Sequence, residues 1–219
     1  MTDQAITDES PGSTLFPEFD TLYELITNEV EGLTEEQLDW SSEDYGWAEW
    51  SIRVQLSHMA SLIYRWLILR WGDVTFPDDE HGVDDVNGLA DSPYDRRMDD
   101  TKYYELPDIL TKLREGIELA RRVLSERNVG FLRSHTVTVT LNSGWGLMIQ
   151  AHPAAVVPTE QANTVTMQLE GSMRHIYFEE ITHLFNIQRL KRAQGLTTVS
   201  DLPRVGYWTL DGWDVSEAQ

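Results

Sequence analysis

Apolar residues recur at spacings of three and four in separate stretches of this chain, and such spacing predicts amphipathic helices. Ser51 is a good N-cap for one predicted helix, and Pro107 suits the first turn of another. Gly72 and Gly195 follow the ends of two helices, where a glycine permits the chain to reverse. The pattern predicts helices over about residues 14–32, 51–71, 107–127 and 171–194.

The stretch before the last predicted helix has a different pattern, in which apolar and polar residues alternate. Residues 135–141 and 163–169 both alternate, which is typical of strands with one buried face. Residues 142–144, Asn-Ser-Gly, predict a turn, and we interpret residues 147–152 as a strand that pairs between the other two. We therefore expect a small antiparallel β insertion over residues 131–170, between helices 3 and 4.

The sequence predicts one domain with an acidic loop inside it and an irregular segment at each end. With 219 residues and 41% hydrophobic content, the chain can bury one substantial core. Residues 73–102 are rich in acidic side chains and carry helix-breaking glycine and proline, so we expect an acidic loop. We expect residues 1–13 to be frayed and residues 196–219 to form an extended aromatic tail. The fold class is therefore mainly α, with one domain over residues 14–195.

Charge and the start of the chain narrow the possible partners. The formal net charge is -20, from 37 acidic and 17 basic residues. Nucleic acids and anionic membranes repel such a chain at long range, so we expect neither as a partner. Residues 1–10 have no basic region and no apolar stretch, and Arg65 and Arg70 interrupt the most apolar helix. We expect no signal peptide, no membrane span, and a cytoplasmic protein with a small-molecule substrate.

The chain contains no cysteine. It therefore has no disulfide, no thiolate metal ligand and no thiol nucleophile of its own. Any sulfur chemistry in this protein would need a thiol from a low-molecular-weight molecule.

Candidate metal ligands form a column on the last predicted helix. His175, Glu179 and His183 follow one another at four-residue steps, so neighbours in the column are offset by only about 40° and rise about 6 Å. A neighbouring pair can bind one ion. His175 and His183 are separated by about 12 Å of helix rise, which argues against both binding the same ion. A third ligand must then come from elsewhere in the chain.

His58 is the best candidate for that third ligand. It lies in the middle of the apolar stripe of the second predicted helix, where a lone histidine is more often a hydrogen-bonded core residue. Its combination with the column on the last helix favours a ligand. Two histidines and one carboxylate suit zinc, nickel or iron(II) and leave coordination positions open, which is typical of catalytic sites. A divalent ion in such a site acidifies a bound water or thiol.

These motifs carry a resemblance to a known family. Segment 50–58, which begins with Trp-Ser and ends in His58, and segment 175–183, His-x3-Glu-x3-His, together resemble the DinB family, also called the YfiT-like family. The glutamate in the second motif is similar to the mycothiol-dependent branch, which includes maleylpyruvate isomerase. The resemblance implies a DinB-like four-helix bundle with long crossovers, in which His58, Glu179 and His183 bind one divalent metal ion.

The resemblance also implies roles for the neighbours of these ligands. Arg174 and His175 would line the approach to the metal or support its ligands. Asn186 stands where many relatives carry Gln or His, three residues after the final ligand. Members of the family often pair their bundles, so we expect a homodimer.

Several functional hypotheses stay open at this stage. The first is a metal-dependent enzyme that uses a low-molecular-weight thiol as cosubstrate in a transfer, conjugation or isomerisation. A metal-dependent hydrolase would activate water instead of a thiol. A binding or regulatory module would keep the fold without turnover. Glu180-x2-His183 matches one half of a ferritin-like di-iron motif, but the sequence offers no second helical copy.

The sequence also suggests roles for a few further residues. We expect Glu180 to face solvent or to orient a ligand histidine. Arg65 lies on the stripe of His58 and could bind a substrate carboxylate or form a buried ion pair. His152 is expected near a strand end, in a surface role. Trp47, Trp50, Trp208 and Trp213 could line a pocket wall beside the metal.

Overall fold

The structure is a computed structural model that describes residues 5–140 and 146–218. It is mainly helical and carries a small three-stranded antiparallel sheet. The α-helices of the described parts are α1 Leu22–Val30, α2 Glu35–Asp39, α3 Ile52–Tyr64, α4 Gly72–Thr75, α5 Val86–Ala90, α6 Leu106–Glu126, α7 Val129–Ser134, α8 Gly146–Ala151 and α9 Leu169–Ala193. The strands are β1 Thr136–Thr140, β2 Val156–Pro158 and β3 Thr164–Gln168. Short 3-10 turns are η1 Gly12–Leu15, η2 Pro17–Asp20, η3 Gly46–Ala48 and η5 Tyr207–Thr209, and η4 Arg65–Arg70 is a π-helix.

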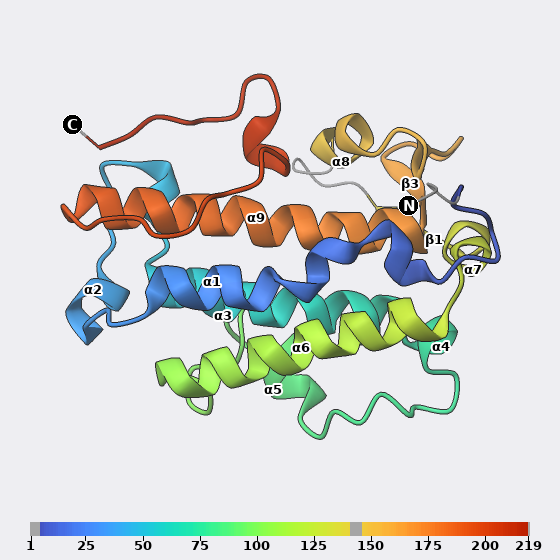
Figure 1. Ribbon diagram of the computed structural model, residues 1–219, viewed down its shortest axis with the longest axis horizontal. Helices are drawn as coiled ribbons and strands as arrows, with labels where there is room; N and C mark the ends of the chain where they lie inside the picture. The colour runs from blue at the N-terminus through green and yellow to red at the C-terminus, as the bar shows by residue number, and fades with distance from the viewer. Residues whose placement is uncertain (1–4, 141–145, 219) are drawn as a thin grey trace.

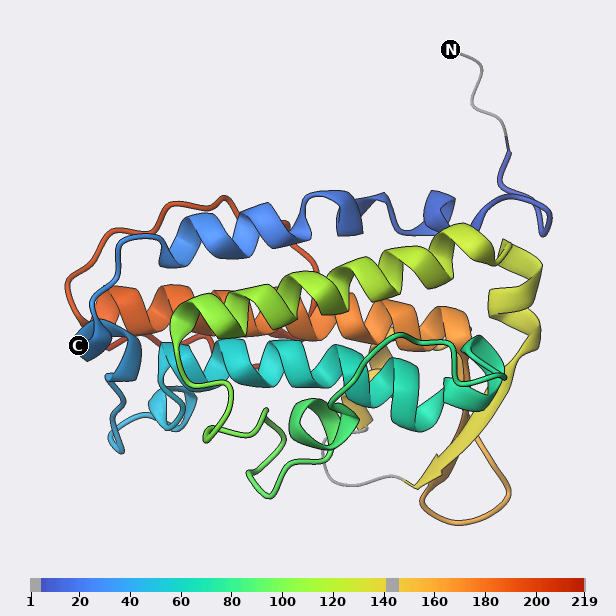
Figure 2. The ribbon, with the colours of Figure 1, turned by 90° about the horizontal axis from the view of Figure 1, so that it is seen from below.

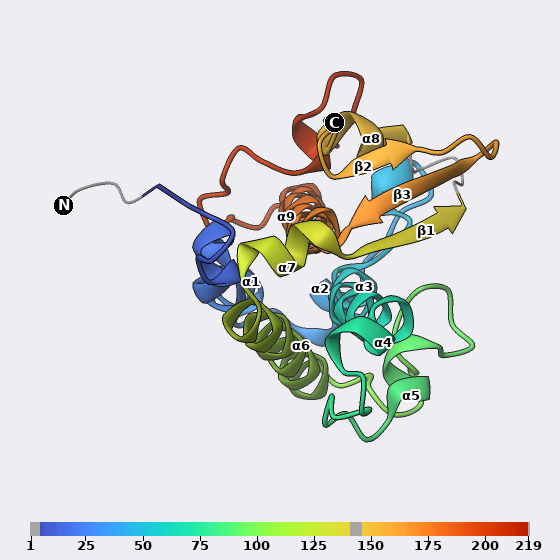
Figure 3. The same cartoon turned by 90° about the vertical axis from the view of Figure 1, so that its right-hand side faces the viewer.

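Helices α1, α3, α6 and α9 lie side by side with roughly aligned axes (Figures 1 and 2). Seen end-on, they surround a common interior, and the sheet lies beside α9 (Figure 3). Helix α3 packs against both α6 and α9, and α1 packs against the same two helices. The side chains that fill the interior are apolar and fully buried, among them Leu56, Ile63, Leu113, Ile117, Ile181 and Leu184. None of the helices in the described ranges combines the length and apolar character that a membrane crossing needs.

The N-terminal ends of helices α3 and α6 lie where their sequences predict them. The Ser51 hydroxyl accepts a hydrogen bond from the Val54 amide at 3.3 Å, and Pro107 occupies the first turn of α6. The predicted helix over residues 14–32 is instead broken into η1, η2 and α1. Pro17 explains the break, because a residue before proline is driven out of the α conformation, and Phe16 has φ -139° and ψ 52°.

The second predicted helix, 51–71, changes its geometry after Tyr64. Residues Arg65–Arg70 form a π-helix, in which the Trp71 amide donates to the Trp66 carbonyl at 3.1 Å. Gly72 does not reverse the chain as expected, because α4 begins at this residue. Gly195 does close α9 in the left-handed conformation, with φ 74°.

The sheet has the order β1-β3-β2, with Thr136 opposite Gln168 and Val156 opposite Met167. The alternating segments 135–141 and 163–169 are therefore strands, as predicted. The prediction of a third strand over residues 147–152 is wrong, because that segment forms α8 and the third strand is β2. A short apolar run has no period that separates helix from strand, and Leu147 and Met148 are good helix formers. The predicted turn at 142–144 lies outside the described residues.

The acidic segment 73–102 is mostly irregular but contains α4 and α5.

The described part of the N-terminal segment is not frayed throughout, because the Gly12 amide donates to the Arg127 carbonyl at 2.8 Å and the Ser10 carbonyl accepts from the Val129 amide at 2.9 Å. The C-terminal segment after α9 runs back along that helix (Figure 1). Its return brings η5 over the middle of α9, next to α8.

Candidate metal centre

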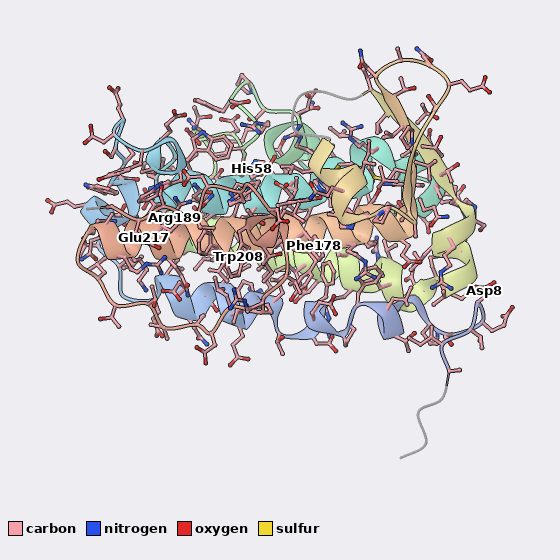
Figure 4. The ribbon with its side chains drawn as sticks, turned by 90° about the horizontal axis from the view of Figure 1, so that it is seen from above. Asp8, His58, Phe178, Arg189, Trp208 and Glu217 are labelled. Carbon is pink, nitrogen blue, oxygen red and sulfur yellow. The ribbon has the colours of Figure 1, made fainter. Side chains whose placement is uncertain are left out.

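His58 of α3 and Glu179 and His183 of α9 meet where these two helices pack together. The Nε2 atom of His183 lies 3.4 Å from Oε2 of Glu179, and Nε2 of His58 lies 3.9 Å from the same oxygen. One ligand atom from each residue lies within 4.8 Å of the others. Figure 4 places His58 near the centre of the molecule, where α3 runs beside α9. The structure thus brings together the three residues that the sequence analysis selected.

The donor set fits a divalent ion. Zinc binds histidine nitrogen and carboxylate oxygen at about 2.0–2.2 Å, so ligand atoms around a tetrahedral ion are about 3.3–3.5 Å apart. The two distances to the glutamate oxygen require only a small contraction of the side chains to reach this spacing. No cysteine is available as a ligand. Three ligands would leave at least one position for another molecule.

Both histidines are held so that Nε2 faces the glutamate. Nδ1 of His58 lies 2.6 Å from the carbonyl oxygen of Arg96, and Nδ1 of His183 lies beside Oε1 of Gln55. Each Nδ1–H therefore donates to an oxygen, which leaves the Nε2 lone pair for a metal, as is usual for metal-binding histidines. The Trp50 ring supports both imidazoles, with centroid distances of 5.1 Å to His58 and 6.1 Å to His183.

The Arg96 backbone is unusual at the position where it supports His58. Its φ is 53°, in the left-handed region that non-glycine residues seldom occupy. Such strained residues cost about 1–3 kcal/mol and tend to occur at functional sites. Nothing in the sequence of this acidic segment identifies Arg96 as a support for the candidate ligand.

The protonation states of His58 and Glu179 suit metal binding. Burial, with a further contribution from His183, lowers the pKa of His58 to about 4, so this imidazole is neutral at pH 7. Burial raises the pKa of Glu179, but the approach of His183 and His58 outweighs it and holds this pKa well below the usual range. A neutral imidazole and an ionised carboxylate are the forms that coordinate a cation.

A pocket of about 380 Å³ opens onto these ligands. Four other residues expected near the metal line it: Arg65, His175, Asn186 and Trp213. Of the other tryptophans, Trp208 stacks on Phe185 at 4.5 Å and the Trp47 ring lies under Arg189 at 4.2 Å. Figure 4 shows Trp208 and Arg189 together along α9. Arg174 does not line the approach; its guanidinium lies 4.8 Å from the centroid of the Phe16 ring.

His175 and Tyr207, which line the pocket, belong to a chain of hydrogen bonds that the sequence did not reveal. The Tyr207 hydroxyl lies 2.6 Å from Nδ1 of His175 and 3.2 Å from Nε2 of His152. Burial lowers the pKa of His175 to about 4 and that of His152 to about 3, so both are neutral. His152 is 4% exposed, so the expectation of a surface role is wrong. Tyr207 lies in an aperiodic tail, and no sequence pattern connects it to α9.

Glu180 lies apart from the cluster. It is fully buried, and neither carboxyl oxygen makes a hydrogen bond within the described ranges. It therefore neither faces solvent nor orients a ligand histidine. Burial and the negative charge of Glu179 raise the pKa of Glu180 well above the usual range, which favours the protonated, neutral form. Because Glu180 is outside the cluster of possible ligands, the described residues offer no support for a di-iron site.

Comparisons with known proteins did not identify a relative. Neither the family models, nor the curated proteins, nor the solved structures gave a match to this chain.

Proposed function

We propose that this chain is a DinB-like, divalent-metal-dependent enzyme that activates a low-molecular-weight thiol for transfer, conjugation or isomerisation. The observation that carries the proposal is the convergence of His58, Glu179 and His183 at the wall of an open pocket. One ligand comes from α3 and two from α9, which agrees with the arrangement that the resemblance implies. A divalent ion bound there would lower the pKa of a thiol or water ligand towards neutrality.

The residues of the chain have separate tasks in this proposal. Gln55 and the Arg96 carbonyl orient the two imidazoles through Nδ1. Trp50 packs beside both rings and helps to hold their orientation. His175 and Tyr207 form a hydrogen-bonded pair on the pocket wall. This pair can exchange a proton with a bound ligand. The thiol itself must come from outside, because the chain has no cysteine.

Thiol binding to cobalt-substituted protein tests the proposal. Cobalt(II) replaces zinc in such sites and gives a visible spectrum that changes when a thiolate becomes a ligand. We expect N-acetylcysteine to produce this change in the wild type and in His81→Ala, whose histidine lies outside the pocket. His183→Ala should not respond. A cobalt spectrum that no thiol alters would contradict the proposal.

Turnover separates the remaining alternatives. Thiol conjugation to 1-chloro-2,4-dinitrobenzene that depends on bound metal would support a transferase. Ester hydrolysis by the metal-loaded protein without thiol would favour activation of water. Bound metal with neither reaction would favour a binding module.

A further inference from the structure

Three arginines line the pocket of the candidate metal centre, although the chain as a whole has a net charge of -20. Arg65 and Arg70 lie on the π-helix that follows α3, and Arg96 comes from the segment between α5 and α6. Glu179 is the single carboxylate among the described residues that line the same pocket. The pocket therefore concentrates positive charge in an acidic protein.

The π-helix explains how two of these arginines reach the same wall. Its hydrogen bonds join residue i to residue i+5, so Arg65 and Arg70 lie one turn apart on the same side. An α-helix would separate them by about 140° around the axis. The guanidinium group of Arg70 lies 4.8 Å from the centroid of the Trp66 ring, which supports it. Departures from α geometry of this kind are frequent at functional sites.

Arg65 has the donors to bind an external anion. Its side chain is half-buried, yet it makes neither a hydrogen bond nor an ion pair with any residue in the described ranges. Burial and the positive charge of Arg96 lower the pKa of Arg65. Desolvation and the charge of Arg65 likewise lower the pKa of Arg70. The guanidinium group of Arg65 is thus repelled by those of Arg96 and Arg70, and a bound anion would relieve this repulsion.

The nearby acidic side chains do not fill this role. Asp95 forms an exposed ion pair with Arg96 at 3.3 Å, and both Asp95 and Asp91 attract Arg65 only at longer range. Glu179 faces the two ligand histidines. The five donors of a guanidinium group match the oxygens of a carboxylate or a phosphate, which makes arginine the usual residue for such anions.

We propose that Arg65, Arg70 and Arg96 form an anion subsite, which binds a carboxylate or phosphate group of the molecule that reaches the metal. This inference rests on the proposed function, because it places a metal beside the arginines. It specifies the substrate class: a small anionic molecule, with its oxyanion on the π-helix and its reacting atom at His58, Glu179 and His183.

Two thiols of similar size test the subsite in cobalt-substituted protein of measured metal content. The first is 3-mercaptopropionate, which carries a carboxylate, and the second is 3-mercapto-1-propanol, which is uncharged. Each is titrated by its change in the cobalt spectrum. We expect the carboxylate thiol to bind about ten-fold more tightly or better, the size of a charge-assisted hydrogen bond. Succinate and inorganic phosphate, added as competitors, identify the preferred oxyanion.

Variants assign the preference to the arginines. Arg65→Gln and Arg70→Gln should each reduce the preference for the carboxylate thiol while the affinity for the uncharged thiol stays the same. Arg70 is exposed, so its variant should fold even if the half-buried Arg65 variant does not. Arg114→Gln, on the exposed face of α6, should behave as the wild type.

The outcomes separate this inference from the function on which it rests. If no cobalt binds, or no thiol changes its spectrum, the proposed function fails and the inference fails with it. If both thiols bind the metal with equal affinity, or the arginine variants keep the full preference, only the anion subsite is refuted.

Discussion

Glu29→Gln should destabilise the protein strongly, because Glu29 joins the tail to the helices. Its carboxylate is fully buried and accepts a hydrogen bond from Lys191 Nζ at 2.6 Å. It also accepts from Gln188 Nε2 at 2.9 Å and from the amides of Val199 and Ser200 at 3.1 and 2.8 Å. These contacts hold α1, α9 and the start of the tail together. The tail in turn carries residues of the pocket wall.

The burial of Lys191 determines how much unfolding free energy the Glu29→Gln variant loses. The variant leaves the ammonium of Lys191, whose side chain is 4% exposed, without its counter-charge. Removal of one partner of a buried ion pair costs about 3–5 kcal/mol of unfolding free energy. For a chain of this size about 1 kcal/mol shifts Tm by roughly 2–4 °C, so the melting temperature should fall by about 10 °C. Glu24→Gln, on the exposed face of the same helix, should change the unfolding free energy by less than about 0.5 kcal/mol.

The effect should also depend on pH. Burial raises the pKa of Glu29, but the bonds from Lys191, Ser200, Gln188 and Val199 outweigh it and lower the pKa below its ordinary value. A carboxyl whose folded pKa is lowered stabilises the fold above its unfolded pKa of about 4.3, and this stabilisation is lost as pH falls through the folded value. Urea unfolding at pH 7 and at stepwise lower pH should show the wild type lose its advantage over Glu29→Gln. An advantage that is small at pH 7, or constant into acid, would refute the reasoning.

Three further variants test other parts of the account. Gln55→Leu removes the acceptor for Nδ1 of His183, so competition with a chelator should show metal affinity reduced by about 10- to 100-fold; unchanged affinity would mean that Gln55 does not orient the ligand. Ser51→Ala removes the cap of α3 and should cost about 0.5–2 kcal/mol in urea unfolding, and no loss would contradict the capping role. Tyr207→Phe leaves His175 without its hydroxyl partner and should cost about 1–3 kcal/mol, whereas wild-type stability would show that this buried bond contributes nothing.

Local sequence patterns predicted the elements and the candidate ligands that depend on nearby residues. The ends of α6 and α9 follow from a proline and a glycine at fixed positions, and the column of Glu179 and His183 follows from helical spacing. His58 could be selected because its helix has a clear apolar stripe. In each case the periodicity of the chain determines which side chains share a face.

The rest of the site depends on long-range packing that no local period records. Tyr207 reaches His175 because an irregular tail folds back over α9, and Arg96 reaches His58 through a strained backbone in the acidic segment. The apolar spacing over residues 51–71 predicted one continuous helix and gave no sign of the π-helix that aligns Arg65 with Arg70. Only the folded chain could reveal these contacts.

The metal content of untagged protein, purified without chelator, tests the central claim most directly. Elemental analysis should find about one equivalent of zinc, nickel or iron per wild-type chain, since the three ligands suit a single ion. His81→Ala should keep this content, and Glu179→Ala should lose it while the circular dichroism spectrum stays helical. Wild-type protein without metal that also takes up none from solution, or equal metal content in the wild type and Glu179→Ala, would contradict the account.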